Sequence, residues 1–352
     1  MKVVQYGVGK MAKYTMRYVF EKGWEIVGAF DRDENKFGKD ISVFIEDKKY
    51  YGIKVQSAAL FEEFLYEQKP DIVIITTMSL FSDIYDSLEI CAKCGVNAIT
   101  SCEEAFFPLN SNPALYNKID KLAKQNNCTI TGSGYQDVYW GNLIASIAGS
   151  SHAIKRIVGK SSYNIEDYGI ALAKAHGAGL SLAEFEDQIS STDNMSEHAQ
   201  KQLIENQIFL PSYMWNVNGW LADKLGLEII SQQQQHIPEI ATKDIYSNTL
   251  QMEIKKGCAK GMRATVTSKT KQGITIISQC VGKVYDETEF DFNSWTIEGE
   301  PSTTFVINQP STMELTCATI VNRLPDVIKS PAGYISTSSM DIPRYKNSIK
   351  IL

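Results

Sequence analysis

Residues near the start of the chain have the spacing of a phosphate-binding turn. Gly7, Gly9 and Ala12 form the pattern G-x-G-x-x-A, between a predicted strand at residues 2–6 and a predicted helix at 13–20. The first glycine permits a tight turn, the second lets a pyrophosphate approach the backbone, and the alanine lets the helix pack closely on the strand. The free N–H groups at the start of such a helix attract phosphate. We therefore expect a nicotinamide dinucleotide to contact Gly7, Gly9, Lys10, Met11 and Ala12.

A carboxylate stands where this motif needs one for the adenosine ribose. A second predicted strand, residues 25–30, ends in Asp31, 24 positions after Gly7. A carboxylate there accepts from the ribose hydroxyls and repels a 2′-phosphate, so it favours NAD. Arg32 beside it could stack on adenine or accept that phosphate, which keeps NADP as an alternative.

Polar residues follow three further predicted strands. In an open parallel sheet the ligand lies outside the carboxyl ends of the strands, where hydroxyls and small residues can meet it. The alternatives are plain helix caps for the hydroxyls and a turn requiring positive φ for the glycines. We expect the ribose, pyrophosphate and nicotinamide to contact residues at these ends, namely Thr76, Thr77, Ser79, Ser101, Gly134 and Tyr135.

Two adjacent carboxylates, Glu103 and Glu104, follow the predicted strand at 95–100. A carboxylate at this edge could hold an ammonium or iminium group, or move a proton while hydride moves. The alternative is a pair of capping residues favoured by a helix dipole. Alcohol oxidation usually needs a base such as histidine, and no histidine precedes His152. We therefore expect Glu104 and Glu103 to be catalytic and the substrate to carry a C–N bond.

The cysteines and histidines do not suggest a metal site. Seven cysteines, an odd count, fit a reducing cytoplasm better than a disulfide framework. Cys91 and Cys94 have C-x-x-C spacing, but they lie inside a predicted helix without a second pair, so we expect two buried or half-buried thiols. The four histidines are scattered. We expect no metal.

The elements that position these residues change character along the chain. Roughly the first 140 residues alternate strand and helix, which predicts a doubly wound parallel sheet. Later strands follow one another with spacing typical of an antiparallel sheet, and four glutamines at 232–235 predict a solvated patch. We expect an α/β Rossmann domain at 1–148, an α+β domain with a largely antiparallel sheet at 149–309, and a C-terminal helix and tail at 310–352 returning to the first domain.

Composition narrows the range of partners. The chain has 352 residues, a formal net charge of −6 and no basic block, which argues against nucleic acid and anionic membranes. No apolar run is long enough to span a bilayer. The first residues already have the pattern of a strand, so we expect no signal peptide and a cytoplasmic protein.

Several sequence blocks together resemble one enzyme family. They are residues 7–12, 31–33 with 38–40, 101–104 with 107–108, 132–134, 176–181 with 184–185, and 321–325 with 331–333. The chain resembles the NAD(P)-dependent amine dehydrogenases and 2,4-diaminopentanoate dehydrogenases, a branch related to dihydrodipicolinate reductase. This resemblance implies a Rossmann domain, an α+β domain that binds substrate and builds a homodimer, and a catalytic glutamate within the Glu103–Glu104 pair. We favour Glu104, since related dehydrogenases place their working residue just after a Cys-Glu dipeptide.

One loop departs from the family pattern. The family usually continues the G-x-G loop with an Asn-Pro-Gly type of turn, whereas residues 135–140 read Tyr-Gln-Asp-Val-Tyr-Trp. Asp137 would add a third carboxylate, which suits a cationic or diamino substrate; an Asx turn or helix cap is the alternative. Tyr168 and His176 are candidates to line the substrate pocket, with core or surface positions as their alternative.

Taken together, these observations predict an oxidoreductase that interconverts a primary amine, on an amino acid or diamine-like molecule, and a ketone plus ammonia. The cofactor is NAD, with NADP as the alternative, and the partners are a small-molecule amine and a second copy of the chain. A reductase of a cyclic or bound imine is a second hypothesis, because it needs the same cofactor site. A nicotinamide-binding sensor without turnover is a third, although a sensor needs no carboxylate at the nicotinamide end.

Overall fold

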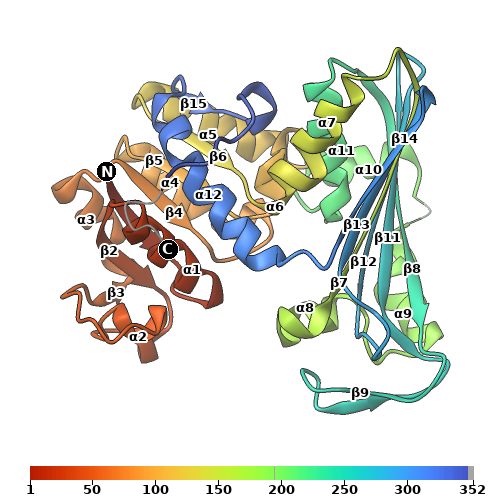
Figure 1. Ribbon diagram of the computed structural model, residues 1–352, viewed down its shortest axis with the longest axis horizontal. Helices are drawn as coiled ribbons and strands as arrows, with labels where there is room; N and C mark the ends of the chain where they lie inside the picture. The colour runs from red at the N-terminus through yellow and green to blue at the C-terminus, as the bar shows by residue number, and fades with distance from the viewer. Residues whose placement is uncertain (194, 348–352) are drawn as a thin grey trace. The chain divides into compact units, whose positions relative to one another are not determined.

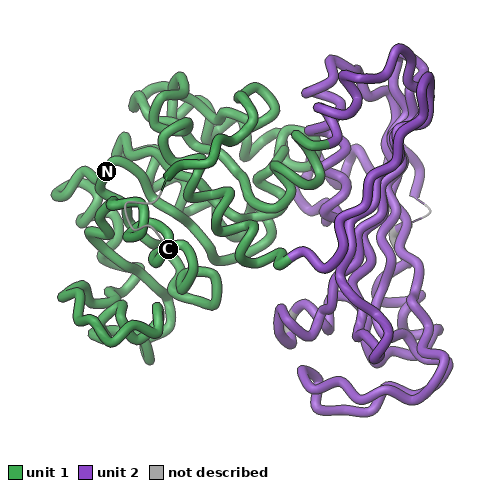
Figure 2. The backbone as a smooth tube through the Cα atoms, in the orientation of Figure 1, with its two compact units in different colours: residues 1–143, 311–352 green, residues 144–310 purple. Residues whose placement is uncertain are grey.

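The computed structural model describes residues 1–193 and 195–347. The chain divides into two compact units, residues 1–143 with 311–352 and residues 144–310 (Figure 2). The first boundary falls at the start of helix α7 (Leu143–Ala148), five residues before the boundary expected from sequence, and the second falls one residue after the expected one.

The first unit contains a seven-stranded parallel sheet. Its strands are β1 (Lys2–Tyr6), β2 (Glu25–Asp31), β3 (Val55–Ser57), β4 (Ile72–Ile75), β5 (Asn97–Thr100), β6 (Thr129–Gly132) and β15 (Gly333–Tyr334). They lie in the order β15-β6-β5-β4-β1-β2-β3, and every neighbouring pair runs parallel (Figure 1). Strand β1 pairs with β2 on one side and with β4 on the other, so the strand order reverses there. Such a reversal opens a crevice at the carboxyl ends of β1 and β4.

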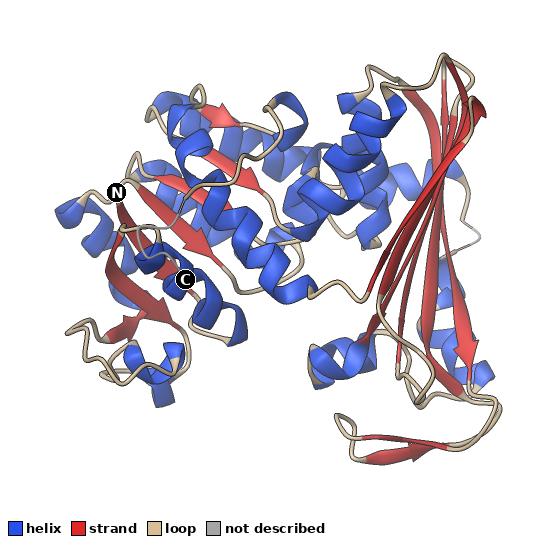
Figure 3. Cartoon of the chain, in the orientation of Figure 1, coloured by secondary structure: helices blue, strands red, loops and turns tan. Residues whose placement is uncertain are grey.

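Helices cover both faces of this sheet because its strands are apolar on both sides. The helices are α1 (Lys10–Glu21), α2 (Ser42–Ile45), α3 (Phe61–Gln68), α4 (Phe81–Lys93), α5 (Pro113–Gln125), α6 (Tyr135–Asp137) and α12 (Thr312–Lys329). Within β4, Val73 and Ile75 pack in one core with α3, α4 and α5, while Ile72 and Ile74 pack in the other with α1 and α12. Figure 3 shows the alternation of strands and helices in this unit.

The second unit contains a six-stranded mixed sheet. Its strands are β7 (Ala153–Asn164), β8 (Ile229–Ile240), β11 (Ala259–Thr270), β12 (Thr275–Lys283), β13 (Phe292–Glu300) and β14 (Thr303–Asn308). They lie in the order β14-β13-β7-β12-β11-β8. The β12–β7 pair runs parallel and the other four pairs run antiparallel, which confirms the prediction of a largely antiparallel sheet. Strands β9 (Ile245–Ser247) and β10 (Met252–Ile254) form a separate hairpin.

Helix α11 (Tyr213–Lys224) packs on one face of this second sheet. The amide of its Asn218 donates to the hydroxyl of Ser268, and its side-chain oxygen accepts from the hydroxyl of Ser278, on the neighbouring strand. The other helices of this unit include α8 (Ile170–Ala175), α9 (Leu182–Gln188) and α10 (Glu197–Glu205). Among the described residues, no helix combines the length and the apolar character needed to cross a membrane.

Candidate active site

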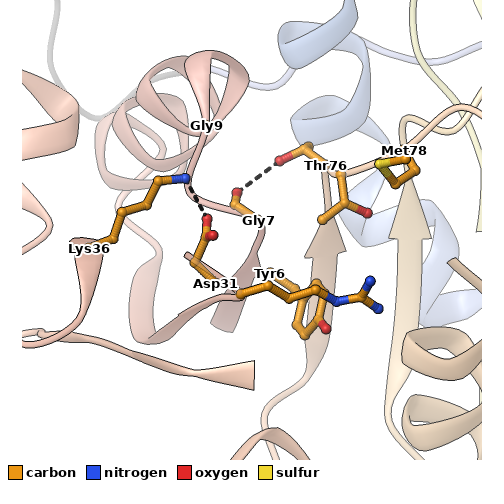
Figure 4. Close-up of a pocket in the computed structure, with 9 residues that line it drawn as sticks. Tyr6, Gly7, Gly9, Asp31, Lys36, Thr76 and Met78 are labelled. Carbon is orange, nitrogen blue, oxygen red and sulfur yellow. Dashed lines mark hydrogen bonds and ion pairs between the residues drawn. The ribbon is translucent and has the colours of Figure 1, made fainter. Parts of the chain in front are cut away.

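A cavity of about 250 Å³ lies at the carboxyl ends of β1, β2 and β4, where the strand order reverses (Figure 4). Six of the thirteen residues predicted to bind the cofactor line this cavity. They come from segments far apart in the sequence, which the parallel sheet brings to one edge. The lining residues are Tyr6, Gly7, Gly9, Asp31, Arg32, Lys36, Thr76, Thr77 and Met78.

The two glycines of the turn serve different purposes. Gly7 has φ +88°, and a Cβ atom there would lie 2.6 Å from the carbonyl oxygen of Thr76. The fold itself therefore requires glycine at position 7. At Gly9 a Cβ atom would meet nothing within 4 Å. The open space beside Gly9, at the N-cap of α1, is where a pyrophosphate can reach the first N–H groups of the helix.

A buried polar network fixes the carbonyl of Gly7. The side-chain amide of Gln5 donates to that carbonyl oxygen at 3.0 Å and to the hydroxyl oxygen of Thr76 at 2.8 Å. The Thr76 hydroxyl donates to the same carbonyl at 3.1 Å, and the Thr15 hydroxyl donates to the side-chain oxygen of Gln5 at 2.7 Å. Thr76 therefore supports the turn through its side chain, while Thr77 is exposed at the rim of the cavity.

Asp31 is held in place by three donors. Its Oδ2 accepts from the backbone N–H of Val8 at 2.7 Å and from Nζ of Lys36 at 2.9 Å, and its Oδ1 accepts from the N–H of Asp33 at 2.9 Å. Burial acts to raise the pKa of Asp31, but the hydrogen bonds from Asp33, Lys36 and Val8 together outweigh it and lower the pKa. The carboxylate is therefore ionised at neutral pH, as an acceptor for ribose hydroxyls must be.

These features fit a dinucleotide. The open backbone beside Gly9 and the start of α1 would hold the pyrophosphate, and Asp31 would hold the adenosine ribose. A nicotinamide ring bound in this way supplies a carbon that accepts or gives a hydride.

Taken as whole residues, Glu104 is the more buried of the two adjacent glutamates. It is 5% exposed, and its carboxylate accepts from the backbone N–H of Phe81 and from the hydroxyl of Ser111, each at 2.7 Å. It thereby caps the first turn of α4, which is the alternative role that its sequence position allows. Burial raises the pKa of Glu104, although these two hydrogen bonds act to lower it.

Glu103 keeps part of its surface exposed. Desolvation by the protein around its carboxyl group raises its pKa, and a hydrogen bond from the Ser79 hydroxyl opposes this shift. The carbonyl oxygen of Ser79 accepts from the thiol of Cys102 at 3.1 Å and from the N–H of Glu104 at 3.2 Å. The segment after β4 and the turn after β5 are therefore joined directly, and Ser79 holds the glutamate pair.

Asp137 does not face a substrate. It is 0% exposed, and its two carboxylate oxygens accept from Nε and Nη2 of Arg323 in α12, at 2.7 and 3.0 Å. The hydroxyl of Ser133 and the amide of Asn142 donate to the same carboxylate, each at 2.8 Å. The prediction that Asp137 binds substrate is therefore corrected, because the whole carboxylate is enclosed in an ion pair within the first unit.

The glycine loop after β6 is fastened to the same helix. The N–H of Tyr135 donates to the hydroxyl of Thr316 in α12, and a Cβ atom at Gly134 would lie 3.0 Å from the methyl carbon of Thr316. The ring of Tyr135 stacks on that of Tyr139 at 4.5 Å between centroids. The contacts of Gly134 and Tyr135 with nicotinamide stay predictions.

In the second unit, His176 and Tyr168 both meet Tyr163. The Nδ1 atom of His176 lies 2.8 Å from the carbonyl oxygen of Leu172, which can only accept, so Nδ1 carries the proton. Its Nε2 then accepts from the hydroxyl of Tyr163 at 2.5 Å. Burial lowers the pKa of His176 to about 4, so the ring is neutral at physiological pH. Tyr168 is 40% exposed and contacts the ring of Tyr163 edge-on.

Comparison with known proteins identifies the family. The model of the 2,4-diaminopentanoate dehydrogenase C-terminal domain matches residues 139–349. The chain belongs to the 2,4-diaminopentanoate dehydrogenase family. It is 23% identical over 354 residues to the 2,4-diaminopentanoate dehydrogenase of Acetoanaerobium sticklandii, covering 98% of this chain and 94% of the relative. The resemblance found in the sequence is thereby confirmed.

Solved structures agree with this assignment. The amine dehydrogenase of Mycobacterium smegmatis is 33% identical, covers 98% of this chain and 97% of its own, and superposes with a TM-score of 0.87. The myo-inositol 2-dehydrogenase of Lactobacillus plantarum shares the fold alone, at 12% identity and a TM-score of 0.55, over 93% of this chain and 88% of its own. The chain is an NAD(P)-dependent dehydrogenase with the predicted Rossmann fold.

Sequence reasoning missed three residues that line the cavity of this dehydrogenase: Tyr6, Lys36 and Met78. Tyr6 is the last residue of β1 and Met78 follows Thr77, so the strand ends could have indicated both. Lys36 lies five residues after Asp31 in a polar loop, and no motif marked it. The remaining predicted contacts, which the cavity lining does not include, are Lys10, Met11, Ala12, Ser79, Ser101, Gly134 and Tyr135.

Proposed function

We propose that this dehydrogenase oxidises a primary amine to a ketone and ammonia, with NAD or NADP as the acceptor. The observation that carries the proposal is the similarity, over nearly the whole of both chains, to an enzyme named as an amine dehydrogenase. The overall reaction takes an alkylammonium ion, water and oxidised cofactor to a ketone, ammonium, reduced cofactor and a proton.

Glu103 is the residue that we propose to contact the amine, in place of the expected Glu104. As a whole residue Glu103 is the more exposed, although protein surrounds its carboxyl group, which accepts from the Ser79 hydroxyl. Both carboxylate oxygens of Glu104 are engaged with Phe81 and Ser111. Glu104 is then a positioning residue that fixes the turn on which Glu103 stands.

The chemistry follows from the protonation of Glu103. A nicotinamide cofactor held beside Gly9 and Asp31 would supply the acceptor for a hydride from the amine-bearing carbon. Loss of that hydride needs the nitrogen lone pair, so the ammonium group must first give up a proton. Glu103 takes this proton, and its raised pKa makes it a stronger base than an ordinary carboxylate. Its negative charge, before it takes the proton, holds the cationic substrate.

The substrate class follows the relatives. An amino acid or diamine-like molecule remains our proposal, on the name of the Acetoanaerobium sticklandii enzyme. Asp137 was predicted to bind a second amino group of the substrate, but its carboxylate is buried in an ion pair with Arg323. We therefore test simple alkylamines as substrates alongside diamines and amino acids. Tyr168 and His176 stay candidates for the substrate pocket of the second unit.

We also propose a homodimer in the cytoplasm. The face of the second sheet opposite α11 carries Val158, Thr267 and Ile277 in one row across three strands, all partly exposed, and Val306 is 54% exposed. A second copy covering this face would bury these side chains. Sedimentation of the wild type against Val306→Arg tests the homodimer, and a wild-type monomer would refute it.

The cysteines support the proposed location in the cytoplasm. All seven are free thiols, which is typical of proteins in a reducing compartment.

The decisive experiment measures reduced cofactor and ammonia at alkaline pH. The panel contains 2,4-diaminopentanoate, ornithine, lysine and simple alkylamines, each with NAD and with NADP. We expect turnover on at least one amine with one ammonia released per reduced cofactor. Turnover without ammonia would overturn the proposed deamination, and so would silence across the panel with NADH still binding.

Two matched variants test the roles of the glutamates. Glu103→Gln should bind NADH normally and lose most of kcat, about 100-fold or more. Glu104→Gln keeps one acceptor for the N–H of Phe81 and should retain most of kcat, with lower stability. The reverse order of the two activities would restore Glu104 as the catalytic residue.

A further inference from the structure

Lys36 is the one cation paired with the ribose-binding carboxylate among the residues that the structure describes. It lies at the end of a short 3₁₀ helix, Glu34–Lys36, in the loop after β2. Its Nζ is 2.9 Å from Oδ2 of Asp31 and 3.9 Å from Oδ2 of Asp33. Its side chain is 24% exposed and lines the cavity beside Gly9 and Asp31 (Figure 4).

The position of Asp31 does not depend on Lys36. The N–H groups of Val8 and Asp33 hold both carboxylate oxygens at 2.7 and 2.9 Å without help from the lysine. Removal of the lysine charge should therefore leave the carboxylate where it is. The lysine in turn has donors to spare, because an ammonium group has three N–H bonds and Asp31 uses one of them.

This arrangement changes what the carboxylate does to a 2′-phosphate. An ionised Asp31 alone would repel the phosphate that distinguishes NADP from NAD. With Lys36 bound to it, the Asp31–Lys36 pair has no net charge, and the Arg32 guanidinium in the lining offsets the carboxylate of Asp33, which lies 3.9 Å from the Lys36 ammonium. The two remaining N–H bonds of Lys36 can then meet phosphate oxygens while the third stays on Asp31.

We propose that Lys36 makes the adenosine site bispecific: Asp31 accepts from the ribose hydroxyls of NAD, and Lys36 binds the 2′-phosphate of NADP beside it. The inference rests on the proposed cofactor site but not on the identity of the amine. It assigns cofactor choice to a residue that no sequence motif marked.

The test uses fragments of the cofactor and needs no amine. Adenosine 2′,5′-bisphosphate and 5′-AMP compete with NADH, whose fluorescence reports its binding, on the wild type, on Lys36→Gln and on Lys39→Gln. Lys39→Gln is the matched control, because it removes the same charge from an exposed side chain of the same loop. We expect Lys36→Gln to weaken the bisphosphate about 10- to 100-fold and 5′-AMP less than about threefold. Lys39→Gln should change neither by more than about threefold.

Three outcomes would overturn the proposal. The first is a wild type that binds adenosine 2′,5′-bisphosphate no better than 5′-AMP. The second is an equal loss of both fragments in Lys36→Gln, which would make the lysine a general support of the loop. The third is an equal loss of the bisphosphate in both variants, which would indicate only the charge of the loop. These binding measurements do not depend on any amine. The proposal about Lys36 can therefore be tested even if the amine assay shows no turnover, and the two proposals fail separately.

Discussion

Replacement by alanine should mainly reduce stability at Gly7 and mainly reduce NADH affinity at Gly9. At Gly7 the added methyl group must adopt φ +88° and would lie 2.6 Å from the carbonyl oxygen of Thr76, which is backbone and cannot rotate away. The left-handed conformation costs about 1–2 kcal/mol, and the overlap with packed atoms costs about 1–3 kcal/mol. Gly7→Ala should therefore lose about 2–5 kcal/mol of unfolding free energy, a fall in Tm of roughly 5–15 °C.

At Gly9 the protein offers no obstacle to the methyl group, since nothing lies within 4 Å of the Cβ position. Alanine is a poorer N-cap than glycine, so Gly9→Ala should cost about 1 kcal/mol or less in stability. The same methyl group would occupy the space through which a pyrophosphate reaches the start of α1. NADH affinity should therefore fall at least about tenfold, which corresponds to about 1.4 kcal/mol.

Thermal unfolding and NADH fluorescence titration on the two variants separate these effects. Gly7→Ala should move Tm strongly, and Gly9→Ala should move mainly the dissociation constant for NADH. A Gly9→Ala protein that binds NADH as the wild type does would refute the placement of the pyrophosphate beside α1.

Three further predictions concern the support of the site. Because the pKa of Glu103 is raised in the folded state, ionisation of this carboxyl group destabilises the fold. The loss of unfolding free energy is absent below the ordinary pKa of 4.5 and grows as pH rises through the raised pKa. Glu103→Gln should therefore have a higher Tm than the wild type at about pH 8, with the difference vanishing near about pH 4, and a constant difference would contradict the assignment. Arg323→Met should lower the free energy of unfolding in urea by about 3–5 kcal/mol, because it leaves the Asp137 carboxylate buried without its partner. Adding Asp137→Asn should recover part of that loss. A double variant no more stable than Arg323→Met would count against the ion pair. Thr76→Val removes one hydrogen bond to Gly7 and one acceptor for Gln5, so NADH binding should weaken about 2- to 10-fold by titration, whereas unchanged binding would deny the network a role in holding the turn.

Part of the lining of the cavity beside β1 and β4 was predictable because its information is local. The turn at Gly7 and Gly9 and the carboxylate at Asp31 each sit at a strand end that the sequence marks by itself, and a parallel sheet brings such ends to one edge. The spacing of the later strands in turn predicted the mostly antiparallel second sheet. The sequence did not indicate that Lys36 lines the cavity, because its position depends on how a polar loop folds back towards Asp31. No short sequence pattern encodes that fold.

The error at Asp137 has a different origin. A carboxylate soon after a strand end resembles a site residue, and its true partner, Arg323, lies 186 positions later in α12. Nothing in the sequence around either residue signals that pairing. The difference between Glu103 and Glu104 was also hidden from the sequence. The donors to the Glu104 carboxylate come from Phe81 and Ser111, which lie outside its own turn.

The glutamines at 232–235 form a solvated patch only in part. They lie in β8, where side chains alternate between faces. Gln232 donates to the carbonyl of Trp215, and Gln234 donates to that of Leu210, while Gln233 and Gln235 are exposed. Four identical residues carry no hydrophobic alternation, so the sequence could not indicate which of them turn inwards.

The return of α12 and β15 to the first unit has a consequence for how the protein is made. Strand β15 completes the parallel sheet beside β6, and Ile320 and Leu324 of α12 complete the core that contains Met16 of α1. A ribosome releases residues 1–143 long before these segments exist, and it must first produce the whole second unit, residues 144–310. During that interval the apolar face beside α1 lacks its cover and Asp137 lacks its guanidinium, so the first unit can complete its fold only after the whole second unit has been made.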